Sequence, residues 1–341
     1  KRLKPVLHAR FLRQSGVLLW QSGQMAEALT HFEEALAISR EAGDRQGEGA
    51  ARTYLATAYG EQGYSAKALT CVEQAVAIHR EGGDRHGEAM ALVALAVVAY
   101  NKGNSAEAYN AFEQANATWR EMGHHRHLGL GYSNLGSICT EEGRGDEALA
   151  YFEQALTCVQ EMGDRRMEGL ILGNLGSLHM ERKRFPEALR CIEQAVATAR
   201  DIGDRRVEGV NLGNLGELLY KAGDLSGAEE YLQQAIEIAD ENMRTAAGAF
   251  RGQLAQIRPD QGDLKEARAL LDVGGSLLRS VSTLQFGRLL CVRARVEQLA
   301  GDAGAASAAL AEAETIAEEV DAGPDSELGK EISKARTALA G

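Results

Sequence analysis

The sequence is poor in aromatic residues, proline and cysteine, and each shortage narrows the choice of fold. Aromatic residues make up 5% of the 341 positions, and proline occurs only at Pro5, Pro186, Pro259 and Pro324. Proline breaks helices in their interior, so a long chain with so few prolines favours long helices. The five cysteines include no Cys-X-X-Cys pair, which indicates reduced thiols in a cytoplasmic protein.

Net positive charge and long apolar runs are also missing. The formal net charge is −12, whereas a protein that grips nucleic-acid phosphates needs a basic surface. No run of 18 apolar residues occurs, so no membrane-spanning helix is predicted, and no signal-peptide pattern is present. Nucleic-acid and membrane partners are therefore not expected.

The charge that is present is unevenly distributed. Residues 1–26 contain basic residues and no acidic residue, whereas residues 301–341 contain nine acidic and three basic residues. The sequence leaves open whether these ends attract one another in self-association or each face another domain of the same chain. Because the first residue is Lys1 rather than Met, we expect a fragment of a longer protein.

What the sequence does contain is an internal repeat of 40 residues. Gly-Asp-Arg segments begin at Gly43, Gly83, Gly163 and Gly203, and Gly123-His124-His125 stands at the missing point of this series. A second series lies halfway between, at Gly23, Gly63, Gly103, Gly143, Lys183, Gly223, Gly262 and Gly301. Five residues further on come the alanines Ala28, Ala68, Ala108, Ala148, Ala188, Ala228, Ala267 and Ala306, each followed four residues later by a larger apolar residue. Such self-similarity is typical of a repeat array.

Each repeat predicts two amphipathic helices separated by a turn. One helix pair cannot bury both of its apolar stripes, so neighbouring pairs must stack. Small residues recur where the two helices of a pair would meet, at Gly16, Ala56, Ala96, Gly136, Gly176 and Gly216. The Asp of each Gly-Asp-Arg segment is placed to cap the following helix.

These residues resemble the tetratricopeptide repeat (TPR) family. Leu135-Gly136, Ala148, Phe152 and Ala155 match its pattern, and the match recurs along the chain. The 40-residue length resembles the subtype of Pins-type scaffolds and of bacterial regulatory TPR arrays. The resemblance implies an all-α fold: an α-solenoid of about eight helix hairpins that forms a right-handed superhelix, with a C-terminal capping helix.

The expected domain organisation follows from the repeat. The superhelix would span residues 1–324, with repeats at approximately 1–42, 43–82, 83–122, 123–162, 163–202, 203–241, 242–280 and 281–322. Repeats seven and eight drift: Arg258 and Glu297 stand at a position that is apolar in most earlier repeats, and Pro259 should end its helix early. Residues 325–341 carry Leu328, Ile332, Ala335 and Leu339 on one face, which predicts the capping helix.

The resemblance also implies where a partner would bind. In this family the first helix of each pair lines the concave groove, and the residue two before the small residue points into it. Here these residues are Gln14, Tyr54, Ala94, Asn134, Asn174, Asn214, Gln253 and Val292. The three asparagines resemble the ladders of peptide-binding arrays, because an amide donates and accepts at once. The alternative is that asparagine merely belongs to the duplicated sequence.

Neighbouring positions complete the expected groove. Ser137 and Ser177 are small and polar, and would leave room for a ligand beside the asparagines. Toward the N-terminus the groove becomes more aromatic, and Tyr54 and Tyr100 are candidate anchors. Tyr220 is a further groove candidate in the C-terminal half.

The other polar clusters were weighed as chemistry. His124, His125 and His127 could hold a metal, but an exposed turn is favoured because no carboxylate or cysteine lies at ligand spacing. His179 is interpreted as a packed histidine rather than a base. The Asp-Arg pairs could bind a charged ligand, but helix caps and inter-repeat ion pairs are favoured. No catalytic motif appears, so we expect no enzyme, no cofactor and no metal.

The leading functional hypothesis is a protein-interaction scaffold that binds a protein or an extended peptide in its concave groove. The alternative is a regulatory or sensor segment of a larger bacterial signalling protein, such as an ATPase switch, a kinase or a transcription regulator. In that case the groove would bind an effector or another domain of the same chain.

Overall fold

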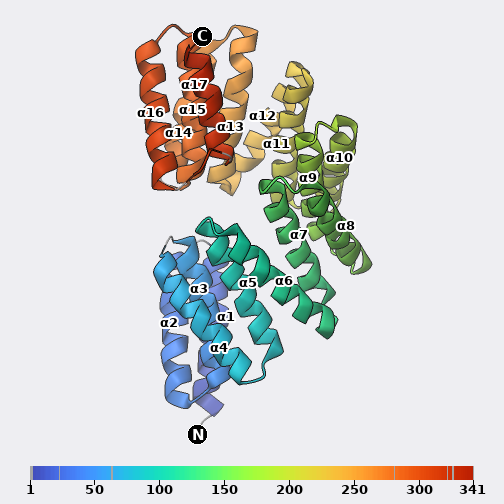
Figure 1. Ribbon diagram of the computed structural model, residues 1–341, viewed down its shortest axis with the longest axis vertical. Helices are drawn as coiled ribbons and strands as arrows, with labels where there is room; N and C mark the ends of the chain where they lie inside the picture. The colour runs from blue at the N-terminus through green and yellow to red at the C-terminus, as the bar shows by residue number, and fades with distance from the viewer. Residues whose placement is uncertain are drawn as a thin grey trace. The chain divides into compact units, whose positions relative to one another are not determined.

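The protein is built from helices that follow one another in hairpins, as the repeat predicts. A computed structural model describes residues 3–22, 24–62, 64–279, 281–320, 322–324 and 326–340 (Figure 1). Within these ranges it contains 17 α-helices, one short 3-10 helix and no strand. The turn glycines Gly23 and Gly63 lie outside the described residues.

The helices have nearly constant length until the last repeats. They are α1 (Leu3–Gln21), α2 (Met25–Ala42), α3 (Arg45–Glu61), α4 (Ser65–Glu81), α5 (Arg85–Asn101), α6 (Ser105–Met122), α7 (His125–Glu141), α8 (Gly145–Glu161), α9 (Arg165–Glu181), α10 (Phe185–Asp201), α11 (Arg205–Ala222), α12 (Leu225–Asn242), α13 (Arg244–Ile257), η1 (Arg258–Gln261), α14 (Leu264–Leu278), α15 (Thr283–Leu299), α16 (Ala303–Glu319) and α17 (Glu327–Ala340).

The chain divides into two compact units. Unit 1 comprises Lys1–Glu142 with Glu153–Met162, and unit 2 comprises Gly143–Phe152 with Gly163–Gly341. In unit 1 the helix pairs α1–α2, α3–α4 and α5–α6 stack in order, and α7 packs on α6. In unit 2 the pairs α9–α10, α11–α12, α13–α14 and α15–α16 stack in order, and α17 packs on α15 and α16.

The odd-numbered helices form the more closely spaced layer of each unit. In unit 1, α1 contacts α3 and α3 contacts α5, and in unit 2 each odd-numbered helix from α9 to α15 contacts the next one, ending at α17. Even-numbered helices pack mainly on their own partner and on the next odd-numbered helix. We call the surface of this closely spaced odd-numbered layer the inner face of each unit.

The turns between helices confirm the predicted roles of glycine and aspartate. Gly163 and Gly203 both adopt a left-handed backbone with φ 68°, which glycine enters without steric cost. Asp164 and Asp204 then accept a hydrogen bond from the backbone N–H three residues on, at 3.1 and 3.0 Å. Lys183, the exception in the second turn series, is held at φ 59°.

The two helices of a pair approach each other closely at the small residues, as the sequence predicts. A Cβ at Gly176 would lie 2.4 Å from Cγ1 of Ile192, and one at Gly216 would lie 2.6 Å from Cγ of Leu232. Both distances are far below van der Waals contact, so only glycine fits without a shift of its neighbours.

Ion pairs connect successive repeats at equivalent positions. Three of them join the last turn of an even-numbered helix to the first turn of the next: Arg40–Glu48, Arg80–Glu88 and Arg200–Glu208, at 3.2, 2.9 and 2.8 Å. The glutamates are largely buried and the arginines half exposed. The aspartates of the Gly-Asp-Arg segments serve as caps, as predicted, whereas the arginine that follows each of them pairs within its own repeat, as Arg165 does with Glu168 and Asp201. The inter-repeat ion pairs come from arginines that lie before these segments.

The drift in the last repeats is accommodated locally. α13 ends at Ile257 and a 3-10 turn follows at Arg258–Gln261, as predicted from Pro259. Arg258 is buried but lies 2.9 Å from Glu229, and Glu297 is buried against Arg268. In α17, Leu328, Ile332 and Ala335 are buried in the same core as α15 and α16, and Leu339 packs beside them.

Candidate peptide-binding face

The predicted asparagines lie on odd-numbered helices, distributed between the two units. Asn134 is on α7 in unit 1, while Asn174 on α9 and Asn214 on α11 belong to unit 2. All three side chains are half-buried. Gln253 on α13 continues the same series in unit 2, and we call Asn174, Asn214 and Gln253 the amide row.

A second polar row runs three residues further along the same helices of unit 2. It consists of Ser177, Glu217, Gln256 and Arg295, and we call it the mixed row. Gln253 donates from Nε2 to Oε2 of Glu217 at 3.2 Å, which joins the two rows across α11 and α13. Arg295 donates to Oε1 of Gln256 at 3.2 Å, which joins α15 to α13.

The mixed row ends on α17. The same Arg295 nitrogen lies 3.2 Å from Oε2 of Glu331, whose other carboxylate oxygen accepts from Lys334 at 2.6 Å. Burial alone would raise the pKa of the Glu331 carboxyl, but Lys334 and Arg295 outweigh it and hold that pKa below its ordinary value. Glu331 is therefore a carboxylate that the inner face of unit 2 holds in place.

A less compensated carboxyl lies at the end of α9. Burial raises the pKa of Glu181, Glu327 on α17 adds to the effect, and Lys221 and Lys330 oppose it. Lys221 itself lies 2.8 Å from Glu217. The inner face of unit 2 thus alternates neutral amides with charges of both signs.

Unit 1 presents a more apolar version of these positions. Tyr54 on α3 is half-buried and stacks on Phe32, with ring centroids 5.3 Å apart and planes 11° apart. Ala94 at the equivalent position of α5 is buried. Tyr100 donates its hydroxyl to Glu141 on α7; burial and this bond raise the pKa of the phenol.

The predicted groove residues differ in how much hydrogen-bonding capacity they have left for a partner. Ser137 and Ser177 donate their hydroxyls to the carbonyls of Ser133 and Gly173 in their own helices, and keep only acceptor capacity. Tyr220 is half-buried beside the apolar core of α12 and α13. Tyr54 and Tyr100 are partly engaged within the fold, and in the amide row Gln253 already donates to Glu217 while its Oε1 is buried.

Sequence reasoning did not identify the mixed row as a unit. Glu217, Gln256 and Arg295 differ in chemistry, so no motif connects them. The signal that could have found them is the spacing between successive members, which is 40, 39 and 39 residues from Ser177 onward and follows the spacing of the amide row. Their hydrogen bonds depend on how the repeats stack, which the spacing does not show.

The histidines of the 123–127 turn differ from the prediction. His125 is exposed, as expected of a turn, but His124 and His127 are half-buried, and His127 stacks on Trp119. The expectation of an exposed turn is therefore wrong for these two residues, because side chains from α5 and α6 cover them. Among the described residues, no group of three ligands is placed to hold a metal ion.

His179 is half-buried on α9, and burial lowers the pKa of its imidazole. Its Nδ1 is buried without a hydrogen-bond partner in the described structure. A base needs a group to orient it, so this environment agrees with the interpretation of a packed histidine.

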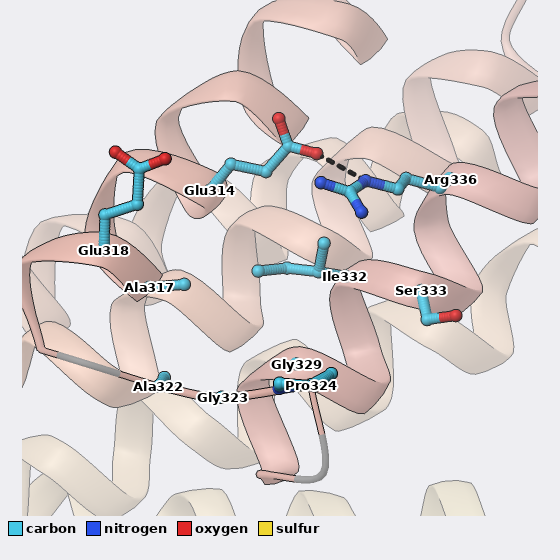
Figure 2. Close-up of a pocket in the computed structure, with 10 residues that line it drawn as sticks. All are labelled: Glu314, Ala317, Glu318, Ala322, Gly323, Pro324, Gly329, Ile332, Ser333 and Arg336. Carbon is cyan, nitrogen blue, oxygen red and sulfur yellow. Dashed lines mark hydrogen bonds and ion pairs between the residues drawn. The ribbon is translucent and has the colours of Figure 1, made fainter.

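A pocket of about 480 Å³ opens where α17 meets α16 (Figure 2). Its walls carry Glu314, Glu318 and Arg336, and Ala317 and Ile332 lie between them. Nε of Arg336 on α17 donates to Glu314 on α16 at 2.7 Å, so this bond links the two helices at the edge of the pocket. None of the groove residues predicted from the sequence lines this pocket.

No helix in the described ranges is both long and apolar enough to cross a membrane. The predictions of an all-α repeat fold and of its helix hairpins are confirmed, whereas the assignment of groove residues stays a prediction.

Comparison with known proteins places this fold in a family. The family model described as MalT-like TPR region matches residues 124–332, the tetratricopeptide repeat model matches residues 7–81, and the model for anaphase-promoting complex subunit 5 matches residues 88–142. No curated protein sequence matches the chain.

Solved structures show the same fold at low sequence identity. A STAND signal-transduction ATPase with a tetratricopeptide repeat sensor, from Pyrococcus horikoshii, is 20% identical with a TM-score of 0.63, and the match covers 79% of this chain but only 42% of that one. A Rap protein complexed with competence and sporulation factor is 14% identical over 98% and 99% of the two chains, with a TM-score of 0.61.

NprR in complex with its cognate peptide NprX is 15% identical over 94% of this chain and 98% of that one, with a TM-score of 0.57. At such identities the likeness concerns the fold. The MalT-like match, by contrast, rests on the sequence and covers more than half of the 341 residues. The chain therefore belongs to the tetratricopeptide repeat family, as a protein with a MalT-like TPR region.

Proposed function

We propose that the chain binds an extended peptide or an extended segment of a protein along the inner face of unit 2, and that it has no catalytic role. The observation that carries the proposal is the amide row. Asn174, Asn214 and Gln253 repeat one side-chain chemistry at equivalent positions of consecutive inner helices. A primary amide donates and accepts at once, so Asn174 and Asn214 would each pair with a peptide unit whatever side chain that unit carries, while Gln253 extends the row but already donates to Glu217.

The mixed row would supply selectivity beside this backbone recognition. Arg295 and Glu217 are charged, half-buried and already linked to neutral amides. Both charges already have ion-pair partners, Glu331 for Arg295 and Lys221 for Glu217. A partner whose polar side chains add to these pairs would bind better than one that only removes water from them. In unit 1, Asn134, Tyr54 and Tyr100 stand at groove positions of their own helices and stay a separate candidate surface.

The comparisons support a peptide as the partner. NprR, which has this fold, was solved in complex with its cognate peptide NprX. That complex concerns NprR, and it comes to this chain through the shared fold and through the amide row.

The binding test is a selection followed by a matched set of variants. The chain is used to select peptides from a displayed random library, and the affinity of a selected peptide is then measured for wild type and for Asn174→Ala and Asn214→Ala combined. Each neutral hydrogen bond contributes about 0.5–1.5 kcal/mol. The double variant should therefore bind about five- to a hundredfold more weakly. It should melt no lower than wild type, because alanine is the better helix former. Full-strength binding by the double variant would reduce the asparagines to repeat ancestry.

The second candidate is a sensor segment of a larger signalling protein. Two observations favour it. One is the MalT-like family match, and the other is the fold shared with a STAND ATPase that has a tetratricopeptide repeat sensor. The match covers less than half of that ATPase chain, so that protein is much longer than the matched part. Sequencing the complete gene product separates the two. A nucleotide-binding or kinase domain on the same chain would support the sensor, and the inner face would then receive an effector or that domain.

A further inference from the structure

Four rings from three helices meet at one junction of unit 1. His86 lies in the first turn of α5, Trp119 in the last turns of α6, His124 directly before α7, and His127 in the first turn of α7. The ring centroids of the three histidines are 5.6, 5.8 and 5.9 Å apart. Trp119 lies within 5.5 Å of each of them and stacks on His127 at 4.5 Å with planes 26° apart.

Trp119 is the buried centre of this junction. Trp119 is completely buried, and it is among the largest fully buried side chains of the protein. The three imidazoles form part of its cover, because each packs against the indole. A separation of the imidazoles from one another would therefore also expose Trp119 and part the start of α7 from α5 and α6.

The charged groups at this junction oppose protonation of His127. Burial lowers the pKa of its imidazole, and His86, His124 and Arg126 lower it further. The nearby carboxylates are engaged elsewhere: Glu121 pairs with Arg85, and Glu161 lies 3.9 Å from His125. Glu88, on the same helix as His86, pairs with Arg80 and Arg85.

His124 stands where four other repeats carry a capping aspartate. Asp84 and Asp164 at the equivalent positions accept hydrogen bonds from the first turn of their helices, whereas the side chain of His124 makes no such bond. The N-terminus of a helix is its positive end, which stabilises an anion and repels an imidazolium ion. In this repeat the helix N-terminus therefore has a histidine in place of the stabilising aspartate, and a proton on that histidine would destabilise the start of α7.

We propose that His86, His124 and His127 form an acid-sensitive joint, which holds α7 on α5 and α6 when the imidazoles are neutral and loosens when they are protonated. The thermodynamic sign follows from the lowered pKa of His127. The packed state binds this proton less well than the open state, so packing is favoured above the ordinary histidine pKa and weakens as the pH falls below it. For each unit by which the packed-state pKa lies below the open-state one, full protonation favours opening tenfold.

The readout is built into the cluster. The sequence contains two tryptophans, Trp20 and Trp119. A Trp20→Phe background leaves Trp119 as the only indole. Titration from pH 8 to pH 5 should shift its emission to the red in one transition at about pH 5–6.5. Far-UV circular dichroism should change little over the same range, since opening the joint separates helices without melting them.

Two cluster variants and one control test the assignment. The double variant His86→Gln and His124→Gln removes both imidazoles that act on His127, and should lower the transition midpoint by about half to one pH unit. His124→Asp restores the capping residue of the other repeats and places a carboxylate at the helix N-terminus, so it should also lower the midpoint. His8→Gln changes an exposed histidine of α1 and should leave it unchanged.

Hydrogen exchange gives an independent measure. Amides at the start of α7 should exchange at least tenfold faster, relative to the intrinsic rate, at pH 5 than at pH 7, while those of α3 keep their protection. Emission of Trp119 that stays constant to pH 5, or a transition that persists unshifted in the double variant, would overturn the proposal. Simultaneous loss of far-UV signal and of Trp119 emission would overturn it as well, by showing general acid unfolding.

Discussion

Two glycines of unit 2 offer a direct test of how closely the helices pack. Gly176 in α9 and Gly252 in α13 are both buried inside inner helices. A Cβ at Gly176 would lie 2.4 Å from Cγ1 of Ile192, whereas one at Gly252 would lie 3.7 Å from Cδ1 of Leu289. The same substitution to alanine is therefore expected to have opposite effects at the two positions.

The magnitudes follow from two competing terms. Alanine is about 1 kcal/mol better than glycine in a helix interior. Gly252→Ala should raise the unfolding free energy by most of this amount, because its Cβ would lie at an ordinary contact distance of 3.7 Å from Cδ1 of Leu289. At Gly176 the added methyl group meets the fully buried Ile192, and overpacking costs about 1–3 kcal/mol. Gly176→Ala should therefore lose about 1 kcal/mol net, and Gly176→Leu considerably more.

The assay is denaturant unfolding of the full chain followed by far-UV circular dichroism, with the slope checked for constancy between variants. Ile192→Ala alone should cost about 2–5 kcal/mol through the cavity it leaves. In the Gly176→Ala background it should cost less, because the new methyl group fills part of that cavity. Additive effects within about 0.5 kcal/mol, or a stabilising Gly176→Ala, would refute the packing argument.

Three further predictions concern single residues. Lys183 is held at φ 59°, so Lys183→Gly should raise the unfolding free energy by about 1 kcal/mol, and a lowered value would show that its side chain matters more than its backbone. Hydrogen bonds from Arg251 at 2.6 and 2.7 Å lower the pKa of Asp240; Asp240→Asn should therefore cost about 0.5–1 kcal/mol at pH 7, where the carboxylate is half exposed. That difference should vanish as the pH falls through the folded-state pKa, and persistence in acid would contradict the ion-pair account. Burial and the hydrogen bond to Glu33 raise the pKa of Tyr59 to about 12, so Tyr59→Phe should remove a late phase from the ultraviolet titration of the tyrosines, and an unchanged late phase would assign it elsewhere.

The fold was accessible from the sequence because its determinants are local. A turn at Lys183 was predicted from its place in the glycine series, and the caps at Asp164 and Asp204 from the residue type that precedes each helix. The early end of α13 followed from Pro259. Each of these features depends on a few neighbouring residues. Because the same local pattern recurs about every 40 residues, it predicts every helix hairpin of the array.

The interactions between repeats were less accessible, since they depend on stacking. The 123–127 turn was expected to be exposed because the sequence shows its histidines only beside one another, whereas His86 and Trp119 arrive from α5 and α6. The hydrogen bond from Gln253 to Glu217 likewise joins residues 36 positions apart. The amide row was visible because its chemistry repeats, and the mixed row was missed because its chemistry does not.

The central claim is that the amide row binds the backbone of an extended peptide. Isothermal titration of one selected peptide, and of analogues N-methylated at single amides, against wild type and against the Asn174→Ala and Asn214→Ala double variant tests it most directly. If these asparagines pair with the backbone, one N-methylated analogue should bind wild type about tenfold more weakly and bind the double variant as well as the parent peptide does. If every N-methylation weakens binding equally for both proteins, the asparagines do not hold the peptide backbone.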